Sequence, residues 1–160
     1  MRLLLLRHGV AEERELGRPD AERRLTPDGR RRMEAAARGM RRLEIAPDQV
    51  LTSPLPRCRE TADIVCTELG LGDPREDPRL APGADLGAVV DMMVEHPDAY
   101  ELLLCGHQPD LGLITDDLAG AELEVKKGAL IVIEVHRARP RGGMLTALLP
   151  PRTLRALGAD

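Results

Sequence analysis

Two histidines of this chain stand directly after short apolar runs, where a strand would leave the core. His8 lies in Arg7-His8-Gly9 after the leucines at 3–6, and His107 follows Gly106 after the apolar residues 102–105. Apolar runs of this length are typical of buried strands, and ligands of α/β sheets bind at the carboxyl ends of strands. If the two strands are parallel neighbours, both imidazoles lie at one edge of the sheet.

A third, less apolar run at 49–52 reads as another short strand, and it would end at the same edge if it is parallel. It would deliver Ser53 and, one helical turn later, Arg57. The converging set is then Arg7, His8, Arg57 and His107. Two guanidinium groups beside two imidazoles suit a dianion, and the planar fork of arginine suits phosphate oxygens in particular.

The elements that must position these residues alternate along the chain between strand-like and helix-like patterns. Thr26 and Pro27 are favourable residues for the N-cap and the first helical position of one helix. The pattern predicts helices that begin near residues 27, 56, 85 and 109, and strands near 3–6, 49–52, 100–105, 128–135 and 144–149. Such alternation predicts a single α/β domain over residues 1–160, with three α/β/α layers and a mostly parallel central sheet. The last two strands would add an antiparallel edge.

The composition argues against several classes of partner. The formal net charge is −4, and the chain has one Tyr but no Phe or Trp, so we expect neither nucleic acid nor a membrane as a partner. Three cysteines without a Cys-x-x-Cys pair, and an N-terminus unlike a signal peptide, lead us to expect a cytoplasmic protein.

Three ordered motifs give the chain a resemblance to a known family. They are Arg7-His8-Gly9, then Ser53-Pro54-x-x-Arg57-x-x-x-Thr61, then Gly106-His107. In this order they resemble the signature of the histidine phosphatase superfamily, which has the phosphoglycerate mutase-like fold. The short chain is most similar to the SixA-type phosphohistidine phosphatases.

The resemblance implies a role for each motif residue. His8 would be the nucleophile that becomes phosphorylated, which is covalent catalysis. The carbonyl of Gly9 would accept a hydrogen bond from Nδ1 of that ring and leave Nε2 free. Arg7, Arg57 and His107 would hold the phosphoryl oxygens and stabilise the transition state, and Gly9 and Ser53 complete the expected substrate-binding set. The resemblance implies neither a metal nor another cofactor.

The sequence departs from the family pattern at the position of the proton donor. Larger relatives carry a glutamate where this chain has Arg79. Asp77 and Asp85 are nearby candidates for the general acid, although Asp85 is more readily explained as a helix N-cap. Because imidazole leaves more readily than an alkoxide, a missing acid favours a phosphohistidine substrate.

Other functions stay open at this point. His8 and His107 could ligate a metal, but no third ligand stands at the usual spacing and the arginines would repel a cation. The substrate could be a phosphorylated protein or a small phosphorylated metabolite such as a sugar or nucleotide phosphate. A mutase is less favoured, because the chain lacks room for the insertions that enclose a bisphosphate. A catalytically silent phospho-binding module is the alternative from another class.

Overall fold

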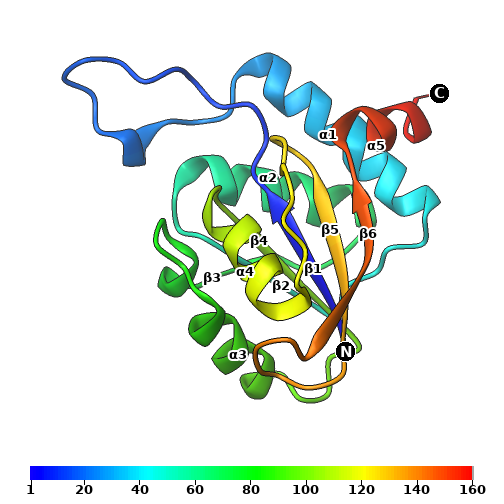
Figure 1. Cartoon of the computed structure of the whole chain (residues 1–160). Coiled ribbons are helices and arrows are strands. Elements are labelled where there is room, and N and C mark those ends of the chain that lie inside the picture. The colour runs from blue at the N-terminus through cyan, green and yellow to red at the C-terminus, as the bar shows by residue number, and fades with distance from the viewer. Residues whose placement is uncertain (160) are drawn as a thin grey trace.

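A six-stranded mixed sheet forms the centre of the protein in the computed structural model, which describes residues 1–159 (Figure 1). Its strands lie in the order β3-β2-β4-β1-β5-β6. β1, β2, β3 and β4 are mutually parallel, whereas β5 runs antiparallel to β1 and to β6. The predicted parallel sheet with an antiparallel edge is therefore confirmed. The strands are β1 (Arg2–Arg7), β2 (Gln49–Thr52), β3 (Arg75–Glu76), β4 (Glu101–Gly106), β5 (Leu130–Val135) and β6 (Gly143–Leu149).

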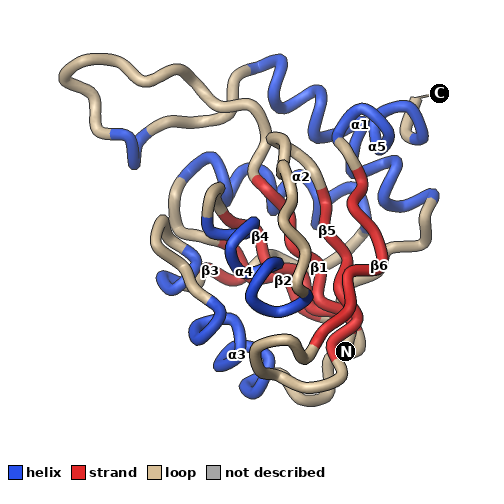
Figure 2. Tube along the Cα trace, in the orientation of Figure 1, coloured by secondary structure: helices blue, strands red, loops and turns tan. Residues whose placement is uncertain are grey.

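Five α-helices among residues 1–159 cover the two faces of this sheet (Figure 2). One face packs against α1 (Pro27–Arg42), α2 (Pro56–Leu69) and α5 (Pro151–Leu157). The other face packs against α3 (Leu86–Glu95) and α4 (Asp110–Ala119). The leucines of β1 alternate between the two cores, as successive strand residues must. This confirms the three-layer α/β/α architecture.

The structure differs from the sequence-based elements at β5, β3 and α5. The strand expected from 128 begins at Leu130, because Gly128 has a positive φ of 81° and makes a turn. Its N–H group donates to the carbonyl groups of Arg7 and His8, which ties this turn to the end of β1. The seven-residue helix α5 and the two-residue strand β3 are not among the elements predicted from the sequence.

The start of α1 fixes the chain where it leaves His8. The hydroxyl oxygen of Thr26 accepts a hydrogen bond from the N–H group of Gly29 at 2.9 Å, as expected for an N-cap. A Cβ atom on Gly29 would lie 2.0 Å from the carbonyl oxygen of Val10. The segment after His8 therefore packs directly on the helix N-terminus, and only glycine fits there.

None of the helices among residues 1–159 has the length and apolar character that crossing a membrane requires.

Candidate active site

The strand register brings the two histidines together at the carboxyl edge of the sheet. In the parallel pair β1–β4, Arg7 lies opposite Gly106, so His8 and His107 follow at the same level. The N–H group of His8 donates to the carbonyl of Gly106 at 3.2 Å. The two imidazole centroids are 5.4 Å apart, and the ring planes are tilted by 60°. The predicted meeting of the imidazoles is present.

A backbone carbonyl fixes the orientation and tautomer of His8. Nδ1 lies 2.7 Å from the carbonyl oxygen of Gly9. A carbonyl can only accept, so Nδ1 carries the hydrogen, and in the neutral ring Nε2 holds the lone pair. The N–H group of Gly9 is held in turn by the hydroxyl of Thr61, which donates to the carbonyl of Arg57. The geometry matches the one that the resemblance implied for Gly9.

The surroundings of His8 keep its imidazole neutral. Its side chain is buried, and desolvation lowers the pKa of His8 from 6.5 to about 3. The hydrogen bond to Gly9 opposes this shift, while electrostatic interactions with His107, Arg57 and Arg7 add to it. A neutral imidazole with a free lone pair on Nε2 is what a nucleophile requires.

Two arginines reach the same edge, and each is anchored through its terminal nitrogens. Nη1 of Arg7 donates to the carbonyl of Val125 at 2.6 Å. Nη1 and Nη2 of Arg57 both donate to Asp20. The Nε atoms of the two arginines are buried and lack a hydrogen-bond partner within residues 1–159. Since buried donors are almost always satisfied, two orphaned guanidinium donors indicate a place for an anion.

The hydroxyl group of Ser53 contacts the imidazole ring of His107. Its oxygen lies 2.8 Å from Nε2 of His107 and also accepts from the N–H group of Leu55. Ser53 is fully buried. The contact with Nε2 orients the ring of His107, and the substrate-binding role of Ser53 stays a prediction.

Both candidate general acids are engaged in local structure. The carboxylate of Asp77 accepts from the backbone and guanidinium of Arg79, and these bonds lower the pKa of Asp77. Asp85 accepts from the N–H group of Ala88 and caps α3. Among the described residues, no carboxylate makes a hydrogen bond to either histidine of the site.

Two further residues contact the arginines of the site and were not predicted from the sequence. The carbonyl of Val125 holds Arg7, and Asp20 holds Arg57. Neither carries a pattern in the sequence, because Val125 lies in a loop and Asp20 in a short 3-10 turn (20–22), and the positions of both depend on tertiary contacts. Within the described part of the chain there is no group of three or more His, Cys, Asp and Glu side chains suited to a metal ion.

Comparison with known proteins gives a family match and several structural matches. The family model described as histidine phosphatase superfamily (branch 1) matches residues 3–101. An uncharacterized protein from Picosynechococcus sp. strain PCC 7002 is 37% identical over 147 residues, covering 87% of this chain and 88% of the relative.

Two solved structures illustrate the fold. The protein histidine phosphatase SixA complexed with tungstate has a TM-score of 0.84 at 22% identity, covering 96% of this chain and 99% of its own. The alpha-ribazole phosphatase from Shigella flexneri has a TM-score of 0.75 at 18% identity, covering 94% of this chain and 97% of its own. At these identities the structural likeness establishes a shared fold.

Proposed function

The chain belongs to branch 1 of the histidine phosphatase superfamily, and from this premise we propose that it is a phosphatase that works through a covalent phosphohistidine on His8. The observation that carries the proposal is the contact between Nδ1 of His8 and the carbonyl of Gly9, at 2.7 Å. It leaves a lone pair on Nε2, in a ring that burial keeps neutral.

The reaction has two phosphoryl transfers. In the first, Nε2 of His8 attacks phosphorus; the N–P bond forms, and the bond to the leaving group breaks with its electron pair. In the second, water attacks phosphorus, the N–P bond breaks and its electrons return to Nε2, and inorganic phosphate leaves. Arg7, Arg57 and His107 stabilise the charge on the phosphoryl oxygens in both steps. The chemistry requires neither a metal nor another cofactor.

The proposed substrate is a phosphohistidine in a protein. An alcohol leaving group needs a proton from a general acid, whereas an imidazole that already carries a proton on its other nitrogen departs as a neutral ring. Asp77 and Asp85, the acids considered first, are bound to Arg79 and to the start of α3. A solved phosphatase named for protein histidine substrates shares the fold, although another named for α-ribazole shares it too.

A substrate panel tests both parts of the proposal. The wild type should hydrolyse a generic aryl phosphate, and should have a higher kcat/KM for a phosphohistidine peptide than for sugar phosphates or nucleotides. His8→Ala should abolish turnover and keep the fold, while His136→Ala removes an exposed histidine outside the site as a matched control. Acid-labile, alkali-stable phosphate on the quenched wild type should disappear in His8→Ala.

Each part has its own contradicting outcome. A preference for sugar or nucleotide phosphates would assign the protein to small phosphorylated metabolites. Anion binding without turnover of any phosphate by the wild type would make it a silent phospho-binding module.

A further inference from the structure

Residues 11–24 belong to the connection between β1 and α1. They follow the motif that contains His8 and extend away from the sheet (Figure 1). The two ends of this segment are joined. The N–H group of Thr26 donates to the carbonyl of Val10, and that of Glu12 donates to the carbonyl of Arg24. The segment is therefore a closed loop that begins and ends beside His8.

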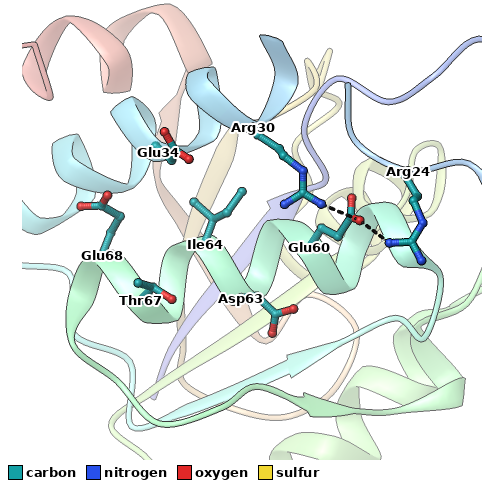
Figure 3. Close-up of a pocket in the computed structure, with 8 residues that line it drawn as sticks. All are labelled: Arg24, Arg30, Glu34, Glu60, Asp63, Ile64, Thr67 and Glu68. Atoms are coloured by element: carbon teal, nitrogen blue, oxygen red, sulfur yellow. Dashed lines mark hydrogen bonds and ion pairs between the residues drawn. The ribbon is translucent and has the colours of Figure 1, made fainter. Parts of the chain in front are cut away.

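A buried carboxylate holds the base of this loop on α2. Glu60 is 7% exposed, and it accepts from the N–H group of Leu25 at 2.8 Å. Its other oxygen lies 2.8 Å from Nη1 of Arg24 and 2.6 Å from Nη2 of Arg30. Figure 3 shows Glu60 between these two guanidinium groups, in a groove of about 410 Å³ along α2. The loop thus returns over the helix that carries Arg57.

Asp20 connects the far part of the loop to Arg57. Nη1 of Arg57 donates to the carbonyl oxygen of Asp20 at 2.9 Å, and Nη2 donates to Oδ2 at 3.1 Å. These two nitrogens form the end of the guanidinium group. The side edge, made by Nε and the second hydrogen of Nη2, is the other edge that can bind an oxyanion through two parallel hydrogen bonds. Nε on that edge is buried and has no partner within residues 1–159.

Asp20 is itself held in place. Its Oδ1 accepts from Nε of Arg14 and from Nε of Arg23, each at 2.9 Å. Arg23 also donates to the carbonyl of Glu12 at the base of the loop. Burial alone would raise the pKa of Asp20, but the charges of Arg57, Arg23 and Arg14 outweigh it and lower the pKa below its ordinary value. Asp20 is therefore a carboxylate at neutral pH and does not supply the missing proton.

We propose that Asp20 is a positioning residue for the phosphoryl-binding arginine. It holds the end of the Arg57 guanidinium group and so presents the Nε side edge to the phosphoryl oxygens. Through Asp20, the conformation of the loop 11–24 affects how well Arg57 binds the transition state. This inference rests on the proposed phosphatase function and assigns a specific task to a residue outside the family motifs.

Paired substitutions test the task of Asp20. Asp20→Ala should lower kcat/KM for an aryl phosphate by about 10- to 100-fold, the effect of a small misplacement of a catalytic group. It should also weaken the binding of tungstate, measured by titration calorimetry. Asp20→Asn should recover part of both, because its amide oxygen still accepts from Nη2, while its NH2 group replaces the oxygen that accepts from Arg14 and Arg23. Glu15→Ala, which removes the same charge from an exposed position of the same loop, is the control.

A double-mutant cycle shows whether Asp20 works through Arg57. In an Arg57→Lys background, which lacks the guanidinium fork, Asp20→Ala should add less than about a twofold loss, because coupled residues are not additive. Fully additive losses would overturn the proposal. So would tighter tungstate binding with undiminished turnover in Asp20→Ala and Asp20→Asn, which would make Asp20 an anion that competes with the substrate.

Tungstate binding, measured by titration calorimetry, tests this inference independently of the proposed function. If the wild type hydrolyses no phosphate, the proposed function fails, but the tungstate affinities of the Asp20 variants still show whether Asp20 presents Arg57 to an oxyanion. Unchanged affinity in Asp20→Ala, with a folded protein by circular dichroism, would overturn the inference alone.

Discussion

Replacing His8 with asparagine should make the folded protein more resistant to acid. Burial lowers the pKa of His8 to about 3, from an ordinary value of 6.5. As the pH falls below 6.5, the unfolded chain takes up a proton on this imidazole and the folded protein does not. The stability contributed by His8 is therefore complete above 6.5 and is lost as the pH falls towards 3. An asparagine side chain at this position would have no proton to take up, while its amide could still donate to the carbonyl of Gly9.

The size of the effect follows from the two pKa values. At about pH 7 the linkage through His8 costs almost nothing, and at about pH 4.5 it costs about 2–3 kcal/mol. Between these conditions the wild type should lose about 2–3 kcal/mol of unfolding free energy more than His8→Asn. All other titrating groups are common to both proteins and largely cancel in this comparison.

Urea unfolding at the two pH values measures the difference. The chain has no Trp and a single Tyr, so far-ultraviolet circular dichroism is the suitable signal. His136→Ala reports the general effect of losing one exposed histidine. A difference between wild type and His8→Asn of less than about 0.5 kcal/mol would refute the reasoning, since it would mean that the folded protein protonates His8 almost as readily as the unfolded chain. An NMR titration of the His8 ring, which should stay neutral down to about pH 4, checks the same point on the wild type alone.

Three further substitutions probe the site and the packing behind it. Arg57→Lys should lower kcat/KM by about 100- to 1000-fold, because lysine lacks the guanidinium fork. The control is Arg59→Lys on the same helix, whose kcat/KM should stay within about twofold of the wild-type value. Arg59 pairs with carboxylates that face solvent. Gly29→Ala would place a methyl group 2.0 Å from the carbonyl oxygen of Val10, and urea unfolding should show a destabilisation of about 1–3 kcal/mol; an unchanged midpoint would contradict the close packing described for the start of α1. Ser53→Ala removes the hydroxyl that orients the imidazole of His107. Steady-state assays should show kcat reduced by about 5- to 10-fold, which corresponds to one hydrogen bond of about 1 kcal/mol. An unchanged kcat would show that Ser53 has no role in catalysis.

The sequence predicted those parts of the site that follow from strand ends. Apolar runs located β1 and β4, and a parallel register then placed His8 beside His107 without further information. Ser53 and Arg57 followed from the end of β2 and one helical turn. What the sequence missed depends on loops. Asp20 lies within a charged segment in which any of several acidic residues could have contacted an arginine, and only the closure of that loop over α2 selects it.

The two arginines show how one pocket serves two requirements. Positive charge near His8 disfavours protonation of the nucleophile, and the same charge binds the phosphoryl group. Both effects need guanidinium groups that are at least half-buried, fixed and only partly hydrogen-bonded. Arg7 meets this need by donating to a neutral carbonyl, that of Val125, so its charge remains undiminished. Arg57 instead contacts Asp20, which fixes the orientation of its guanidinium group. A fixed orientation lets the guanidinium group meet the phosphoryl oxygens of the transition state without rearrangement, which is what catalysis requires.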